Sequence, residues 1–201
     1  MAGMRVKAKG NADDVLKGLD AFASKVELAT TRAVNKLIEQ AETEGLRKMA
    51  ALYQIPKGIF AKYMRVRLAA NGTFVASINA RGQGLPLYLF KPRQIKGRGG
   101  GTKVTLRGRT FLIQHAFIAR MKSGKVGIFA RGAYGGKGKQ AFTGESFGRF
   151  QFGRRRFSIN ELFTISAPGA FSHTEVTAAM NALVEGKSAA ILDREIKFAT
   201  R

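Results

Sequence analysis

The chain of 201 residues contains no cysteine, no tryptophan, only four prolines and only two histidines. Without cysteine it has no disulfide bonds, thiolate metal ligands or cysteine nucleophiles, and this composition suits a reducing compartment. No apolar run follows the first residues, so we expect no secretory signal. The longest mostly apolar stretch, 111–119, is interrupted by Gln114 and His115 and is far shorter than the ~20 residues that cross a bilayer. We therefore expect a soluble protein with no membrane partner.

Acidic residues are also scarce, since 13 Asp and Glu stand against 35 Lys and Arg and leave a net charge of +22. Residues 45–144 contain no acidic residue at all and carry 20 of the basic ones. A surface of one sign repels itself, and a partner with dense negative charge offsets that cost. Phosphate backbones are the first candidate. An anionic membrane surface, an acidic protein, or a generically basic surface with no dedicated partner are the alternatives.

Helical periodicity dominates the N-terminal part of the chain. Asn11 is a candidate cap for a short helix. Ser24 and Glu27 form a capping-box pattern, which predicts that a second, longer helix starts there and runs to about Tyr53. Pro56 favours an end to this helix, because a residue before proline disfavours the helical conformation. The apolar stripe of the first helix comprises Val15, Leu16, Leu19, Phe22 and Ala23.

From residue 65 to 131 the apolar period changes to two, which predicts strands. Turn signals such as Asn71-Gly72 and Ser123-Gly124 separate them, and the short connections favour an antiparallel meander over a parallel sheet. Pro86 places its strand at an edge. The expected strands are 65–68, 73–78, 85–90, 103–106, 110–119 and 125–130.

The last third of the chain begins with a glycine-rich, basic stretch with interleaved aromatics, 132–156, which we predict to be a long loop. Ser172 and Glu175 form a second capping-box pattern, which predicts C-terminal helices. Gly186 is expected to end or bend the first of them. An order of helices, strands, loop and helices predicts an α+β fold in a single domain. The predicted parts of this domain, 1–201, are helical over 11–53, antiparallel strands over 65–131, a basic loop over 132–156 and helices over 172–199.

Three patterns invite a catalytic interpretation, and their contexts argue against it. Residues 144–148 match G-x-S-x-G around Ser146, but the strand and helix that this motif needs are missing from the flanking sequence. The glycine-rich stretch 97–103 lacks the spacing of a phosphate-binding loop and favours a flexible hairpin. His115 and His173 have no clustered carboxylates for a metal site; we expect His115 to pack, partly buried, in a strand and His173 to lie in a first helical turn. We therefore expect no enzyme, metal or cofactor.

Basic and aromatic residues in the loops are candidates for contacts with partners. Lys and Arg neutralise phosphates without fixed geometry and without reading bases. The phenylalanines among them either stack on single-stranded bases or pack against a neighbouring subunit, and we favour packing. The nucleic-acid-facing candidates are Lys91, Arg93, Lys96, Arg98, Lys103, Arg107, Arg109, Arg149, Arg154, Arg155 and Arg156. The subunit-packing candidates are Phe142, Phe147 and Phe150, with Ala33, Leu37, Ala41 and Gly45 on the small-residue face of the long helix.

The layout also carries a resemblance, spread over nearly the full length of the chain without a short diagnostic motif. It rests on Arg32-Ala33-Val34-Asn35-Lys36, Leu85-Pro86-Leu87 leading into 93–101, Gly108-Arg109 followed by Ala116-Phe117-Ile118, the segment 124–132, and Ile165-Ser166-Ala167-Pro168. With these features the chain resembles the minor tail protein Z family of long-tailed bacteriophages, a group of tail completion proteins.

The resemblance implies a structural virion protein at the head-proximal end of the tail, present in the host cytoplasm during assembly. Tail completion, head–tail joining and accommodation of the DNA end are the implied roles. Implied partners are copies of the chain in a ring, a hexamer by tail symmetry, other tail or neck proteins such as the tail tube, terminator and connector, and genomic DNA. A ring lined by acid-free loops would present a positive lumen to DNA. The alternative is a soluble, non-sequence-specific nucleic-acid-binding protein, ribosome-associated or chaperone-like.

Overall fold

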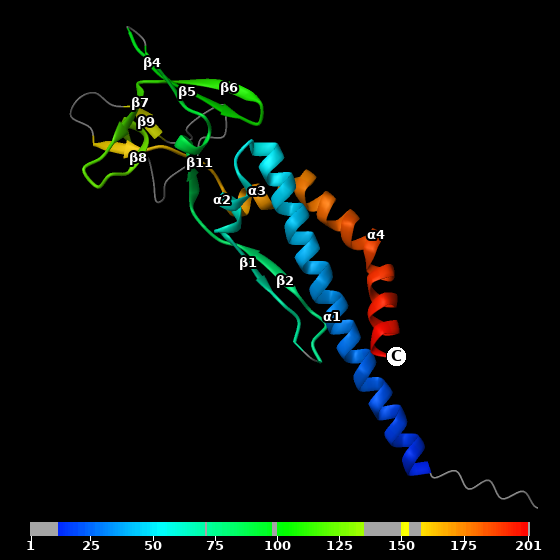
Figure 1. Cartoon of the computed structure of the whole chain (residues 1–201). Coiled ribbons are helices and arrows are strands. Elements are labelled where there is room, and N and C mark those ends of the chain that lie inside the picture. The colour runs from blue at the N-terminus through cyan, green and yellow to red at the C-terminus, as the bar shows by residue number, and fades with distance from the viewer. Residues whose placement is uncertain (1–11, 71, 98–99, 135–149, 153–157, 201) are drawn as a thin grey trace, which may run out of the picture.

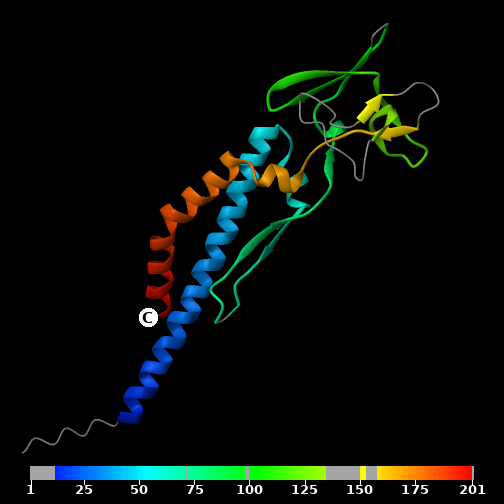
Figure 2. The ribbon, with the colours of Figure 1, turned by 180° about the vertical axis from the view of Figure 1, so that it is seen from behind.

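The computed structural model describes residues 12–70, 72–97, 100–134, 150–152 and 158–200. Two long helices, α1 and α4, lie side by side, and a body of short strands is attached at one end of the pair (Figures 1 and 2). The predicted α+β class and the long N-terminal helix are confirmed. The molecule is elongated, and the free end of α1 is the part farthest from the strands (Figure 1).

Helix α1 is one continuous element over Ala12–Tyr53, so the predicted start of a second helix at Ser24 is wrong. The Ser24 hydroxyl donates a hydrogen bond of 3.0 Å to the carbonyl oxygen of Asp20, one turn earlier in the same helix. Extending a formed helix costs far less than nucleating a new one, so the capping pattern is overridden. The helix ends as expected before Pro56, where Gln54 takes a left-handed φ of 56°. The short helix α2 then covers Lys57–Ala61.

The C-terminal helix, α4, runs without interruption over Thr174–Ala199 and passes through Gly186, where we expected an end or a bend. The helix curves along its length (Figures 1 and 2). Its N-cap is His173, whose Nδ1 accepts a hydrogen bond of 3.4 Å from the backbone N–H of Glu175. The imidazole therefore takes the role expected of Ser172. A short helix, α3, precedes it over Ala167–Phe171.

The two long helices are antiparallel and pack closely where small residues allow it. A Cβ atom added at Gly45 would lie 2.7 Å from Sδ of Met180, so glycine sets the approach of α1 to α4. Farther along, Lys36 Nζ donates to Oε1 of Glu195 at 2.6 Å. This hydrogen bond, opposed by burial, holds the pKa of Glu195 below its ordinary value of 4.5, and the nearby charges of Lys36, Arg194 and Arg32 add to the lowering.

All described strand pairs are antiparallel, as predicted. The strands form four groups: β1–β2, β3–β11, β4–β5–β6, and β7–β8–β10 with β9 also paired to β8. Their bounds are β1 Met64–Arg67, β2 Ser77–Ala80, β3 Gly84–Pro86, β4 Arg93–Ile95, β5 Gly101–Leu106, β6 Arg109–Gln114, β7 Ala116–Arg120, β8 Val126–Tyr134, β9 Phe150–Phe152, β10 Ile159–Glu161 and β11 Phe163–Ser166.

Several strand predictions need correction. The expected strand 110–119 is broken at His115, which is exposed with a φ of 61°, so it is not a packing residue within a strand. The expected strand 85–90 keeps only its first two residues, because a 3₁₀ helix, η1, forms over Leu87–Leu89. The expected strand 73–78 begins only at Ser77. The predicted loop 132–156 is shorter at its start, because β8 continues to Tyr134 and pairs with β9.

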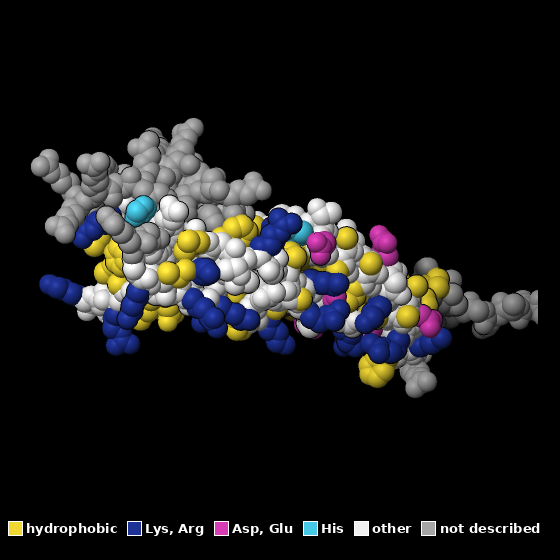
Figure 3. Space-filling view, turned by 90° about the horizontal axis from the view of Figure 1, so that it is seen from above, with side chains coloured by type: hydrophobic (Ala, Val, Ile, Leu, Met, Phe, Trp, Pro, Cys, Tyr) yellow, Lys and Arg dark blue, Asp and Glu magenta, His cyan; other side chains and the backbone are white. Residues whose placement is uncertain are grey.

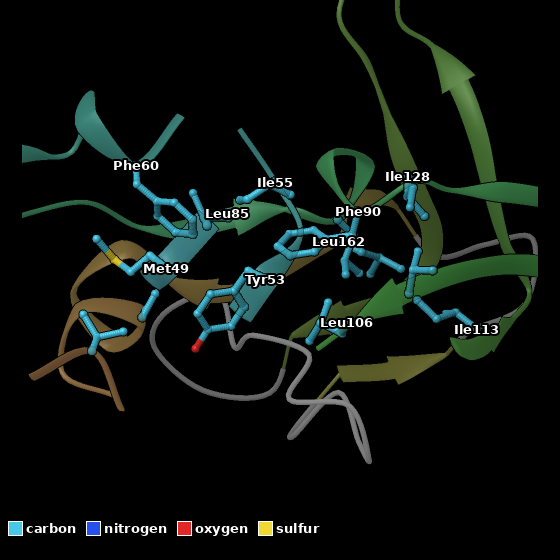
Figure 4. Close-up of a cluster of buried hydrophobic side chains, with 14 of the residues drawn as sticks. Met49, Tyr53, Ile55, Phe60, Leu85, Phe90, Leu106, Ile113, Ile128 and Leu162 are labelled. Carbon is cyan, nitrogen blue, oxygen red and sulfur yellow. The ribbon is translucent and has the colours of Figure 1, made fainter. Parts of the chain in front are cut away.

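The hydrophobic core lies where the helices meet the strands (Figure 4). The C-terminal end of α1 contributes Met49 and Tyr53, and the Tyr53 ring lies 5.9 Å from that of Phe60 in α2. Val176 and Met180 enter from the start of α4. The strands, η1 and the residues next to them contribute Leu85, Leu87, Phe90, Val104, Leu106, Ile113, Ile128 and Leu162. This core anchors both long helices at one end, and their other ends extend away from it (Figure 1).

Candidate nucleic-acid interface

Charge is segregated between two parts of the chain. We define the helical arm as α1, α4 and residues 64–80, which include the β1–β2 hairpin beside α1 (Figures 1 and 2). The arm holds 11 of the 13 acidic residues and 11 of the 35 basic ones, so it is neutral and the remaining residues carry the whole +22. On the face shown in Figure 3, acidic side chains lie over the helical part of the molecule. Of the cationic excess, residues 54–63 and 81–173 carry +18, and residues 1–11 and 201, which flank the two long helices in sequence, carry +4.

The sheet β4–β5–β6 presents cations on its outer face. Arg93 in β4 is the cross-strand partner of Lys103 in β5, and Lys103 in turn is opposite Leu112 in β6. Residues paired in this way point to the same side of a sheet. All three are exposed. Like charges directly opposite each other destabilise a sheet. The repulsion between Arg93 and Lys103 therefore lowers the stability of the sheet, and a bound anion would remove this repulsion.

The position of the β4–β5 hairpin is fixed by hydrogen bonds around Gln94. Its Oε1 accepts from the backbone N–H of Ile118 in β7 at 2.7 Å, and its Nε2 donates to the carbonyl oxygen of Gly101 at 3.1 Å. The hydroxyl of Thr102, a fully buried residue, donates to the carbonyl oxygen of Ala116 at 3.0 Å. Sheet β4–β5–β6 is thereby joined to β7, and the Arg93–Lys103 pair is presented from a fixed backbone.

Arg107 differs from the other predicted cations because it is bound within the chain. Its Nη2 donates to the Tyr53 hydroxyl at 2.9 Å, and its guanidinium carbon lies 5.3 Å from the centroid of the Tyr53 ring. Arg107 and Gly108 have φ values of 48° and 76°, which is the pattern of a tight two-residue hairpin turn between β5 and β6. The side chain therefore fastens this turn to the C-terminal end of α1. No turn signal was assigned to this position from sequence.

The other described candidates are exposed cations. Lys91, Lys96 and Arg109 join Arg93 and Lys103 in this group. Within the described part of the chain, none of these five takes part in a salt bridge. Lys125, by contrast, is paired with Glu161 at 2.5 Å. The candidates Arg98, Arg149, Arg154, Arg155 and Arg156 lie outside the described residues.

The structure also places the candidate subunit contacts. Ala33, Ala41 and Gly45 are buried within the chain, and Leu37 is half-buried. At Gly45 the close approach that its small size permits is to α4 of the same chain. Phe142 and Phe147 lie outside the described residues, as does the side chain of Phe150, the first residue of β9.

The described residues contain no group of three or more His, Cys, Asp or Glu arranged to hold a metal ion. None of the helices described is long and apolar enough to cross a membrane. A hollow of about 340 Å³ between α1 and α4 is lined by Glu39, Gln40, Thr43, Glu44, Leu183 and Lys187, on the neutral arm.

The structure combines a helical arm with a β-rich body that presents exposed cations. In comparison with known protein families, the model of the prophage minor tail protein Z (GPZ) family matches residues 6–200. The chain belongs to this family, and the resemblance seen in the sequence is confirmed. It is thus a phage tail protein. No curated protein and no solved structure matches it.

Proposed function

We propose that the protein acts without catalysis as a tail completion protein at the head-proximal end of the tail. In this proposal it takes part in head–tail joining, copies of the chain form a ring, and the β-rich bodies face the end of the packaged DNA. Membership of the minor tail protein Z family supports a role in the tail. The observation that carries the DNA-facing orientation is the cross-strand pair of Arg93 and Lys103, exposed and without a salt bridge among the described residues.

The physical reason is the way that cations bind DNA. A lysine or arginine near a phosphate releases condensed counterions, so the affinity falls steeply with salt and is independent of sequence. Each copy then needs only a few contacts, because a ring of six copies would multiply them around one duplex. No base needs to be read, which fits a lumen through which any genome sequence passes.

The test is a salt titration of duplex DNA binding by the purified chain. Replacing both Arg93 and Lys103 with glutamine should reduce the slope of log K against log salt concentration by about 1.8, since each lost phosphate contact removes about 0.9. The matched control is the double variant Arg47→Gln and Lys48→Gln, which removes the same charge from exposed side chains of α1. The control should keep the wild-type slope. Equal slopes for the two double variants would refute a DNA-facing β4–β5 hairpin.

The place in the particle has its own test. Electron microscopy of purified virions should show density for this fold at the head-proximal end of the tail. Density at another level of the tail would overturn the proposed position. A chain absent from virions that binds free RNA as a monomer would instead favour the alternative, a soluble nucleic-acid-binding protein.

A further inference from the structure

The helical arm exposes large apolar side chains that its own chain does not cover. In the described part of the chain ten large hydrophobic residues are exposed, and seven of them lie on the arm. They are Leu19, Phe22, Leu28, Leu68, Phe74, Val75 and Phe198. Exposed apolar residues mark an interaction site when they lie together, and less often when they are isolated.

Part of this apolar surface is shaped into a hollow that we call the arm groove. It is lined by Phe22, Ala23, Val26, Glu27, Thr30, Gly72 and Phe74. It has a volume of about 630 Å³. One wall is α1 and the other is the connection between β1 and β2. That connection comes close to the helix, since a Cβ atom on Gly72 would lie 3.3 Å from Oε1 of Glu27.

The groove continues an apolar stripe along α1 toward its free end. Leu19, Phe22, Ala23 and Val26 are spaced three and four residues apart, so they share one face of the helix. Leu19 and Phe22 are 59% and 54% exposed, and Phe74 across the groove is 48% exposed. The N-terminal part of α1 extends past the end of α4, so a second molecule can reach this face without displacing either neighbour (Figures 1 and 2).

Electrostatics selects the partner. Two copies that met through their β-rich ends would bring together the parts, residues 54–63 and 81–173, that each carry +18. Two copies that meet through the neutral arm pay little of this repulsion. An acidic partner protein would instead be drawn to the cationic end of the molecule. The arm is thus the surface on which a second copy of the same chain is tolerated best.

The exposed apolar side chains of this surface can form the centre of an interface. If Leu19, Phe22 and Phe74 each offer roughly 100 Å², they supply about 300 Å² of the ~800 Å² that each partner buries in a standard interface. We propose that a second copy of this chain docks on the arm groove and the adjoining stripe at Leu19. This inference rests on the proposed function in that it supplies the contact by which copies of the tail protein associate.

The test measures the mass of the purified full chain by sedimentation equilibrium over a range of concentrations, at low and high salt. We expect wild type to associate, and more strongly at high salt because salt screens the repulsion between the cationic ends. Phe22→Ser and Phe74→Ser should each weaken association by about tenfold or more. The matched control is Leu112→Ser, which removes a 45% exposed apolar side chain from the β-rich end and should associate like wild type. Circular dichroism verifies that each variant is folded.

A second measurement reports on the groove directly. The chain has no cysteine, so Ala23→Cys carries a spin label at the groove alone, and Ala189→Cys carries one on an exposed part of α4. Association should restrict the label at position 23 and leave the label at position 189 mobile.

Four outcomes would overturn the proposal. They are a single-chain mass at every concentration and salt, groove variants that associate like wild type, a Leu112→Ser variant that loses association as much as the groove variants do, and a spin label at position 23 whose mobility does not change on association. Binding of another tail protein by a chain that stays monomeric would also reject a second copy as the occupant. Groove variants that associate like wild type would reject the groove and leave the proposed ring standing, whereas a monomer under all conditions would reject both. The DNA titration and the position in the virion test the rest of the proposed function independently.

Discussion

Replacing Arg107 with glutamine separates the structural cations of the β-rich end from those proposed to meet DNA. The change removes the 2.9 Å hydrogen bond to the Tyr53 hydroxyl and the cation that lies 5.3 Å from the ring centroid. The hydrogen bond is worth about 1 kcal/mol and the cation–π contact about 0.5–1 kcal/mol at an exposed site. Glutamine, like arginine, is a non-glycine residue at a φ of 48°, so the backbone cost of the turn is largely unchanged. We expect the free energy of unfolding to fall by about 1–2 kcal/mol.

Urea unfolding followed by circular dichroism measures this loss, and the DNA salt titration supplies the contrast. Arg107→Gln should lower stability and leave the salt slope unchanged, whereas Lys103→Gln should lower the slope by about 0.9 and leave stability within about 0.5 kcal/mol. A double-mutant cycle with Tyr53→Phe should show coupling between the two side chains. The reasoning is refuted if Arg107→Gln lowers the salt slope without a loss of stability, because Arg107 would then be one more phosphate contact.

Two further predictions concern packing and pH. Gly101→Ala should destabilise the protein by about 1–3 kcal/mol in urea unfolding, because its Cβ would overlap the carbonyl oxygen of Ile113 in β6. The control is Gly186→Ala in α4, where no atom lies within 4 Å of the added Cβ, and it should stabilise the protein by about 0.5–1 kcal/mol. If Gly101→Ala were as stable as wild type, the close approach of β5 to β6 would be contradicted. Glu195→Gln should cost about 1 kcal/mol at neutral pH, since half-exposed Lys36 weakens the pair. Because the pKa of Glu195 is lowered from 4.5 on folding, its contribution is fully present above that value and is lost as the pH falls through the lowered pKa. If wild type remained more stable than Glu195→Gln at pH values below the lowered pKa, the ionised carboxylate would not be the source of the difference in stability.

The fold was predictable wherever a strong periodic signal had one physical interpretation. The helix ending before Pro56 and the antiparallel pairing of the strands follow from period and turn chemistry. Predictions failed where a local pattern competed with a continuing element. Ser24 matches a cap but lies inside α1, and of the end or bend expected at Gly186 the end does not occur, because α4 continues through it. His115 was assigned to a strand interior because its left-handed backbone leaves no mark in the apolar pattern around it.

The candidate site was predictable in chemistry and less so in arrangement. The absence of acidic residues over 45–144 identifies the cationic segment from sequence alone, because a charge count needs no geometry. The opposition of Arg93 and Lys103 depends on strand register, and register is set by the hairpin turn. The Gln94 hydrogen bonds depend on how one sheet meets β7, which no local pattern encodes. The same limit applies to Arg107, whose partner Tyr53 is 54 residues away in sequence.

Segregation of charge links the two proposals made for this protein. Residues 54–63 and 81–173 carry +18 and the arm has no net charge, so copies that meet through the arm avoid most of the repulsion and keep only what acts between their cationic ends. DNA lying against those ends would neutralise the repulsion that opposes association. By thermodynamic linkage, if DNA strengthens the contact between copies by some factor, association strengthens DNA binding by the same factor. The acidic residues of the arm therefore matter as much as the cations of the sheets: they keep one surface of a strongly basic protein neutral enough to meet its own copy.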